Sequence, residues 1–198
     1  VYFFTTEPAQ SVAEMKELKI FTWAGDEAMV QWWRRNGFKP VSIAATDIST
    51  ALQTGMIDAI SVPPLYAMQV QFFKQAPFMA DIGLAPMMGA ILITERAWNR
   101  IAESDRPALL EAGREAQRRV FETIPKLDAT AIQLMSSQGL EVVEIEGTPS
   151  AQEWKIEAEK FAEAMRGDIV PVEIFDEAAA ARQRWRERAP ESGGEEER

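Results

Sequence analysis

In the first third of the chain, short apolar runs alternate with amphipathic segments. The runs of strand length are Val1–Thr5, Ile20–Trp23, Val41–Ile43 and Met56–Val62. Ser11 and Glu14 stand at capping-box spacing and predict a short helix after the first run. A second helix, which Asp26 or Gly25 opens, is indicated by apolar residues that recur at helical spacing. This order of strands and helices predicts an α/β fold with mostly parallel sheets and right-handed crossovers.

The stretch from 44 to 64 predicts a loop, a short helix and a strand. The oxygen of Thr46 or Asp47 is placed to accept from the free N–H groups of the first helical turn, and Gly55 to close the helix in the left-handed conformation. Two prolines then end the strand at Val62. Such a unit puts a helix N-terminus and a strand C-terminus on one side of a sheet, where open α/β sheets bind ligands.

The rest of the chain predicts more helices and two further strands. The expected elements are a helix over Leu65–Lys74, an irregular connection over Pro77–Pro86, a strand over Met87–Ile93, a helix from Thr94 to Ile101, a long helix from Ser104 or Asp105 to Gly139 with a kink at Pro125, a strand over Leu140–Ile145, helices over Pro149–Gly167 and Val172–Arg188, and a disordered tail after 188. A membrane span over Ala76–Ile93 is the alternative for the apolar middle. Its uninterrupted apolar length is well below the about 20 residues that a span needs.

Composition narrows the function classes. The chain has 198 residues, enough for one large domain or two small lobes, and a formal net charge of −10, which disfavours nucleic acids and anionic membranes as partners. It contains no cysteine and no histidine. Thiolate nucleophiles, disulfides, imidazole bases and the commonest zinc ligands are thereby excluded. We expect neither a cofactor nor a metal site, and the methionines are interpreted as core residues.

The start of the chain resembles a strand without its lead-in. The apolar run Val1–Thr5 begins abruptly, as though a strand had been cut, and this predicts a fragment of a longer protein. Val1–Thr6 has no basic segment and no apolar segment long enough for a signal peptide. In that case the sheet of a first lobe is incomplete. We then expect apolar surface at Ile91, Ile93 and the long helix to stay uncovered and to favour self-association.

Four segments in order carry a family resemblance. They are Glu14–Ile20, Gly37–Val41, Thr50–Ala59 and the long kinked helix ending at Gly139. Together they resemble the DctP family, the extracytoplasmic solute receptors of TRAP transporters, to about Trp185 and over the second half or more of a typical member.

The resemblance implies a periplasmic-binding-protein-like receptor with two α/β lobes, the first of them incomplete. Such a periplasmic receptor closes on one small molecule, often a carboxylate or dicarboxylate, and delivers it to a membrane permease. In these terms residues 1–19 are a remnant of the first lobe, 20–86 the ligand-binding lobe and 87–188 the return to the first lobe with the long and C-terminal helices.

The resemblance also locates a ligand site, at which three usual contacts are replaced. Family members usually carry an arginine that forks onto the ligand carboxylate where this chain has Phe21, often an aromatic residue where it has Ala45, and often an asparagine where it has Val62. The expected ligand-binding residues are Phe21, Trp23, Ala45, Asp47, Val62, Pro63 and Tyr66. Their composition favours a larger and less polar ligand.

Several of these residues have plainer interpretations, and two other functions remain open. Trp23 can cover the edge of a lobe, Phe21 can be a core residue, and Asp47 can cap its helix. An enzyme using Asp26, Asp47 or Asp58 as acid and base is one alternative, although no pair has a convincing spacing and no G-x-S-x-G motif is present. The other is an interaction protein that dimerises through the long helix. We expect a non-catalytic binding protein.

Overall fold

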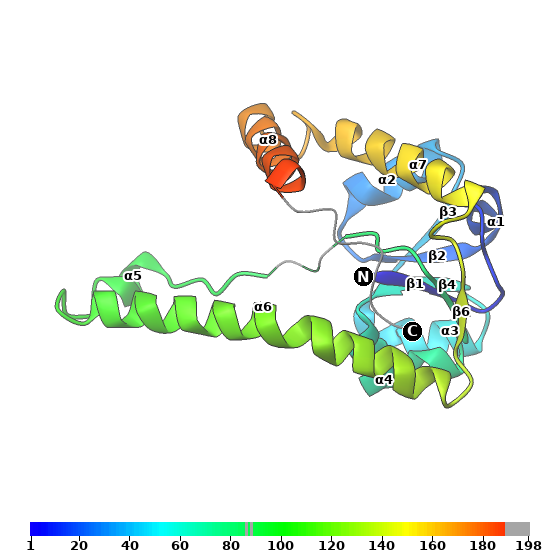
Figure 1. Cartoon of the computed structure of the whole chain (residues 1–198), viewed down its shortest axis with the longest axis horizontal. Coiled ribbons are helices and arrows are strands. Elements are labelled where there is room, and N and C mark those ends of the chain that lie inside the picture. The colour runs from blue at the N-terminus through cyan, green and yellow to red at the C-terminus, as the bar shows by residue number, and fades with distance from the viewer. Residues whose placement is uncertain (86, 88, 189–198) are drawn as a thin grey trace. The chain divides into compact units, whose positions relative to one another are not determined.

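Figure 1 shows a computed structural model of the whole chain, in which residues 1–85, 87 and 89–188 are described. Residues Val1–Trp154 form one compact unit, and a second unit begins at Lys155. The proposed disordered tail after 188 lies outside the described residues.

One six-stranded sheet is the centre of the first unit. Its strands are β1 (Tyr2–Thr5), β2 (Lys19–Trp23), β3 (Lys39–Ile43), β4 (Ala59–Val62), β5 (Phe78–Ala80) and β6 (Glu141–Val143). They are ordered β3-β2-β4-β1-β5-β6. β2 pairs in parallel with β3 and β4, and β5 with β6, whereas β1 is antiparallel to β4 and β5. The α/β fold with a mostly parallel sheet is confirmed.

Helices and two 3₁₀ turns connect these strands. They are α1 (Val12–Glu17), α2 (Glu27–Arg35), η1 (Ala45–Asp47), α3 (Ile48–Gln53), α4 (Pro64–Val70), η2 (Phe72–Lys74), α5 (Glu95–Trp98), α6 (Arg106–Ser136), α7 (Pro149–Met165) and α8 (Val172–Arg188). The long helix α6 runs without interruption through Pro125, and a kink there stays a prediction.

Local capping signals account for several helix ends. The backbone N–H of Glu14 donates to the Ser11 hydroxyl and the Glu14 carboxylate accepts from the N–H of Ser11, so the capping box is confirmed. Gly55 follows α3 with φ +66°, as expected for a left-handed helix end. The cap expected from Thr46 or Asp47 was wrong: neither side chain bonds the first turn of α3. η1 leads directly into α3, so the backbone at Asp47 is helical rather than extended.

Several predicted elements have different bounds in the structure, and three of the differences are substantial. The strand expected from Met56 begins at Ala59, and Met56 is exposed. The helix expected over Leu65–Lys74 is divided into α4 and η2, because Gln71 has a left-handed φ of 62°. The connection expected to be irregular over Pro77–Pro86 contains β5.

The strand expected over Met87–Ile93 is absent among the described residues of that segment, 87 and 89–93. Its apolar side chains are exposed, with Ile91 at 92% of its accessible surface. An apolar run becomes a strand only beside a sheet edge that accepts its hydrogen bonds. Within the described part of the first unit, β3 and β6 form the edges of the sheet and neither pairs with this run.

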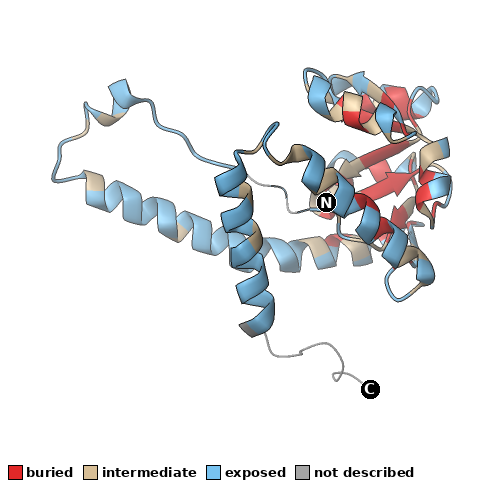
Figure 2. Ribbon diagram, turned by 90° about the horizontal axis from the view of Figure 1, so that it is seen from above, coloured by how far each residue is buried: buried red, intermediate tan, exposed pale blue. Residues whose placement is uncertain are grey.

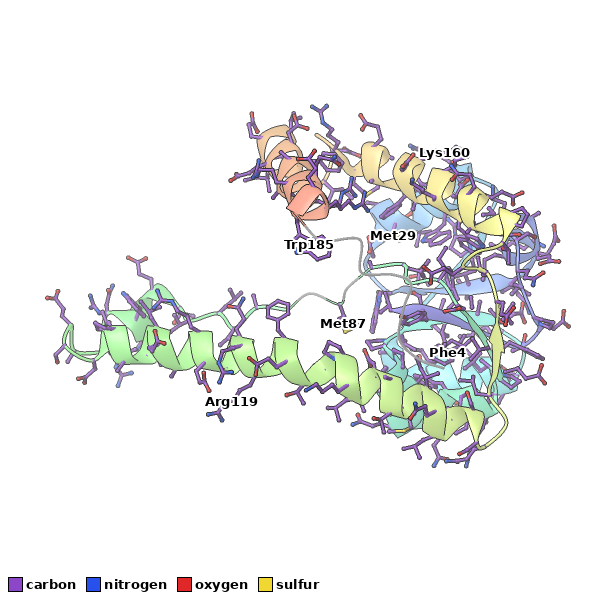
Figure 3. The ribbon with its side chains drawn as sticks, viewed as in Figure 1. Phe4, Met29, Met87, Arg119, Lys160 and Trp185 are labelled. Carbon is purple, nitrogen blue, oxygen red and sulfur yellow. The ribbon has the colours of Figure 1, made fainter. Side chains whose placement is uncertain are left out.

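Both faces of the sheet are covered by helices. On one face Phe4, Phe21, Ile60 and Met79 pack with α3, α4, η2 and Met135 near the end of α6. On the other face, over which α2 lies (Figure 1), Phe3 and Ile20 are buried, and the ring of Phe3 is 6.4 Å from that of Trp33 in α2. Figure 2 shows the buried residues concentrated at the sheet, and Figure 3 shows Phe4 inside this region.

The N-terminal part of α6 is amphipathic and exposed, and Figure 2 shows this stretch pale blue. Arg118 pairs with Glu115 at 2.8 Å and with Glu122 at 2.7 Å, while Phe121 keeps 64% of its surface in water. The expectation of uncovered apolar surface along this helix is confirmed; self-association through it stays a prediction. None of the described helices is both long and apolar enough to cross a membrane.

The second unit contains the rest of α7 and all of α8. The guanidinium of Arg166 donates twice to the Asp176 carboxylate, at 2.8 Å each, and thereby joins the end of α7 to the start of α8. This bonding lowers the pKa of Asp176 from its usual value. Trp185 in α8 is exposed.

Candidate ligand-binding site

Three parallel strands end at the same edge of the sheet. Trp23 at the end of β2 is opposite Ile43 at the end of β3. The β2–β4 register pairs Ile20 with Ala59, which places Val62 at the level of Trp23 three residues further on. The loops that follow these strands lead into α2, α3 and α4. This carboxyl edge is where an open α/β sheet binds its ligands.

Phe21 and Trp23 project from the same side of β2, since side chains two apart along a strand share a face. Their ring centroids are 5.0 Å apart, and the rings are inclined at 72°, edge to face. Phe21 is 3% exposed and belongs to the core, whereas Trp23 is 45% exposed. Phe21 therefore supports the indole, and Trp23 is the member of the pair that is available to a ligand.

The end of β4 and the start of α4 add apolar side chains to this edge. Val62 is fully buried, and Pro63, partly exposed, stands directly before α4. Tyr66, in the first turn of α4, is half-buried against Phe72, with ring centroids 5.6 Å apart. The structure thus brings these three expected residues to one strand end, where apolar surface dominates.

The loop after β3 brings Ala45 and Asp47 to the same edge. Ala45 is partly buried against the core, and Asp47 is exposed, where its carboxylate accepts a 3.3 Å hydrogen bond from the Thr46 hydroxyl. Asp58 lies at the opposite end of the sheet: its carboxylate accepts from the N–H of Lys19 at 3.0 Å and is 3.4 Å from the same residue's ammonium. These contacts join the start of β4 to the start of β2.

Two residues at this edge were not among those expected from the sequence. Tyr2 begins β1 opposite Val62, so it reaches the edge because β1 is antiparallel. Asp128, in α6, accepts a 3.0 Å hydrogen bond from the N–H of Leu65 at the start of α4. The position of Tyr2 can be predicted only if the direction of β1 is known. No local pattern in the sequence predicts the contact of Asp128 with Leu65.

The polar chemistry of the edge is acidic. Asp26, Asp47 and Asp128 stand at or near it, and the loops 24–26, 44–47 and 63–66 contain no lysine or arginine. Among the described residues, no group of three or more acidic, histidine or cysteine side chains is arranged to hold a metal ion. The arrangement offers aromatic contact and carboxylate acceptors.

The sequence matches the family described as bacterial extracellular solute-binding protein, family 7 (DctP), over residues 2–167. The chain belongs to this family. The resemblance inferred from the segments between Glu14 and Gly139 is confirmed. No curated protein matches the chain significantly.

Solved structures of TRAP solute-binding proteins share the fold. The periplasmic ectoine-binding protein of a Halomonas elongata TRAP transporter has a TM-score of 0.75 at 16% identity, covering 92% of this chain and 60% of that one. A Rhodobacter sphaeroides protein in an open form without ligand has a TM-score of 0.72 at 23% identity, and the match covers 92% of this chain and 59% of that one. A Haemophilus influenzae protein with bound L-gulonate has a TM-score of 0.71 at 14% identity, and the match covers 94% of this chain and 59% of that one. The chain therefore spans about three fifths of the length of these proteins.

Proposed function

We propose that this chain is the ligand-binding part of an extracytoplasmic receptor that serves a TRAP-type transporter in the periplasm. It captures a small organic acid or a less polar small molecule and delivers it to a membrane permease. The family match over residues 2–167 carries this proposal. The division into a ligand-binding lobe at 20–86 and a returning first-lobe segment at 87–188 belongs to the same proposal.

The site in this proposal is the carboxyl edge of β2, β3 and β4. Trp23 supplies an aromatic surface, supported from below by Phe21. Val62, Pro63 and Tyr66 form the apolar wall, with Ala45 and Asp47 on the opposite loop. Apolar contact and shape determine affinity at such a site, because an unpaired polar group of the ligand would lose its hydration without compensation.

Native mass spectrometry of the purified chain, before and after mild denaturation, tests the proposal. We expect a small molecule that is released on denaturation and whose chemical structure is unchanged by incubation with the protein. Turnover of that compound would show an enzyme and refute the proposal. A chain that releases nothing and binds no compound from a metabolite panel would refute it as well.

A second candidate function is dimerisation through α6. The observation that favours it is the exposed apolar face of the helix, which includes Phe121. A dimer is compatible with ligand binding, so the two functions are separated by measuring mass and ligand release on the same sample.

A further inference from the structure

A row of hydroxyl side chains lies just inside the carboxyl edge. Thr22, Ser42 and Ser61 are each the last residue but one of their strands, β2, β3 and β4. Thr22 is paired with Ser42 across β2 and β3. The parallel pairing of Ile20 with Ala59 places Ser61 at the level of Thr22, two residues further on. The three side chains therefore form one row on one face of the sheet, which we call the hydroxyl row.

The hydroxyl row is on the opposite face from Phe21 and Trp23, because side chains alternate along β2. Helix α2 lies over the face of the hydroxyl row (Figure 1) and packs against β3. Ser42 is exposed on the edge strand β3, whereas Ser61 is partly exposed and is paired with the buried Phe3 of β1. The row is thus accessible at the Ser42 end and bounded by an aromatic side chain at the other.

The hydroxyl of Thr22, in the middle of the row, is buried without a partner. Thr22 is 4% exposed, and none of the described residues forms a hydrogen bond with its hydroxyl. Such a group costs free energy, because it has lost its bonds to water and has gained none in the protein. Thr5, on the same face of the sheet, shows the usual arrangement: it is also buried, and its hydroxyl donates to the carbonyl of Glu7 at 2.6 Å.

The spacing of the row allows two hydroxyls to share one bound oxygen atom. Adjacent strands are about 4.8 Å apart, whereas a hydrogen bond between two hydroxyl oxygens is about 2.8 Å long. An oxygen atom between Thr22 and a neighbouring serine is therefore within reach of both. The Ser42 hydroxyl makes a long contact of 3.4 Å with the carbonyl of Trp23, so it is able to donate to a closer acceptor.

The chemistry of the row favours a neutral group. Its three side chains carry no charge, so a carboxylate or an ammonium group buried there would lose its hydration without gaining a countercharge. A neutral hydroxyl loses less on burial. It also matches the row in kind, because each hydroxyl can both donate and accept a hydrogen bond.

We infer that the hydroxyl row binds a hydroxyl group of the ligand, and that Thr22 is a specificity-determining residue for hydroxylated small molecules. The inference rests on the proposed function, whose ligand class it narrows. The row is one residue, about 3.3 Å, before the strand ends. The site then has two parts, with apolar contact at Trp23 and Val62 on one face of the sheet and hydrogen bonding at the row on the other.

Thermal unfolding tests the buried hydroxyl in chain that has been freed of small molecules by unfolding and refolding. Valine has a similar shape to threonine but no hydroxyl. We expect Thr22→Val to raise the melting temperature by about 2–4 °C, because it removes a polar group without a partner. Thr5→Val is the matched control. It removes a hydroxyl that has a partner and should lower the melting temperature by a similar amount.

A melting temperature that Thr22→Val leaves unchanged or lowers would overturn the inference. That result would show that the hydroxyl is satisfied in the ligand-free chain, for example by an ordered water.

Isothermal titration calorimetry with the full chain tests the ligand class. The probes are quinate and cyclohexanecarboxylate, which share a ring and a carboxylate and differ in that only quinate has hydroxyl groups. We expect the wild type to bind quinate more tightly. Thr22→Val should lower the affinity for quinate roughly three- to tenfold, as for the loss of one hydrogen bond, and leave that for cyclohexanecarboxylate unchanged. Thr22→Ser keeps the hydroxyl and should retain the preference, and Thr5→Val should bind both probes as the wild type does.

A wild type that binds quinate no more tightly than cyclohexanecarboxylate, or Thr22→Val with unchanged affinity for quinate, would overturn the inference. If neither probe binds, the compound that mass spectrometry finds bound takes their place. Its affinity should fall in Thr22→Val, and an unchanged affinity would overturn the inference while the proposed function stands. If no probe binds and no compound is released, both fail.

Discussion

The carboxylate of Asp128 in α6 accepts a 3.0 Å hydrogen bond from the backbone N–H of Leu65, at the first turn of α4. The two residues are 63 positions apart in the chain. A side chain from one helix thereby satisfies an N–H at the end of another, which local capping residues usually do. Pro63, which precedes α4, provides no such side chain.

Replacement of this long-range cap should weaken the fold. Asp128→Ala leaves the N–H of Leu65 without its acceptor, and we expect the free energy of unfolding to fall by about 1 kcal/mol, as for the loss of a helix cap. Asp128→Asn should lose less, because the amide oxygen still accepts. Urea unfolding of the three proteins measures both values. Equal stability of the alanine variant and the wild type would show that the contact has no energetic role.

The two ends of α6 should respond differently to truncation. Met135 is fully buried in the core, so Met135→Ala should lower the free energy of unfolding by about 2–5 kcal/mol. Phe121 lies on the exposed stretch, so Phe121→Ala should change the free energy of unfolding by no more than about 0.5 kcal/mol. Denaturant unfolding distinguishes them. A large loss from Phe121→Ala would contradict the exposure of this stretch.

The uncovered apolar surface should promote self-association. We expect the mass of the wild-type chain in light scattering to rise with concentration, because Ile91 and Phe121 present apolar side chains to water. A double variant, Ile91→Lys with Phe121→Lys, should shift this rise to higher concentration. A wild-type chain that stays monomeric throughout and binds no apolar dye would refute the prediction.

Trp23 should matter for binding more than for stability. The indole of Trp23 is half exposed at the strand end. We therefore expect Trp23→Ala to lower the affinity for the co-purifying ligand roughly tenfold, which is within the energy of one aromatic contact. Trp185→Ala, which removes an exposed indole from α8, is the control and should leave affinity unchanged. Titration of the stripped proteins with the recovered ligand gives both values. Similar effects of the two substitutions would place the ligand elsewhere.

The capping box of α1 should make stability depend on pH. Backbone N–H groups of Ser11 and Gln10 donate to the Glu14 carboxylate and lower its pKa below the usual 4.5. The unfolded chain then binds a proton more readily than the folded one, so this stabilisation is present in full above pH 4.5 and is lost as pH falls through the lower folded pKa. Glu14→Gln should therefore be less stable than the wild type at pH 7.

Urea unfolding of both proteins between pH 7 and pH 3 measures this effect. The difference in stability between wild type and Glu14→Gln should shrink as the pH falls, since protonation removes the charge from the wild-type side chain. A difference that stays constant over this range would mean that the charge of Glu14 does not contribute.

The sequence by itself determined the elements whose signals are local. The capping box at Ser11, the Asp26 cap of α2, the left-handed Gly55 and the strand ends at Trp23 and Val62 all follow from residues within a few positions of one another. Short segments of this kind also carry the family resemblance, and the resemblance implies the expected site residues at the ends of β2 and β4.

The tertiary structure decided what depends on distant partners. β5 forms in a stretch whose local pattern is irregular, because β1 and β6 pair with it on either side, whereas the apolar run 89–93 pairs with no strand of the sheet and forms none. Asp128 reaches the carboxyl edge of β2, β3 and β4 only because α6 packs against α4. Hydrogen bonds of strands and long-range caps are satisfied by residues far along the chain, so a local pattern predicts the capacity for them and the fold selects which are made.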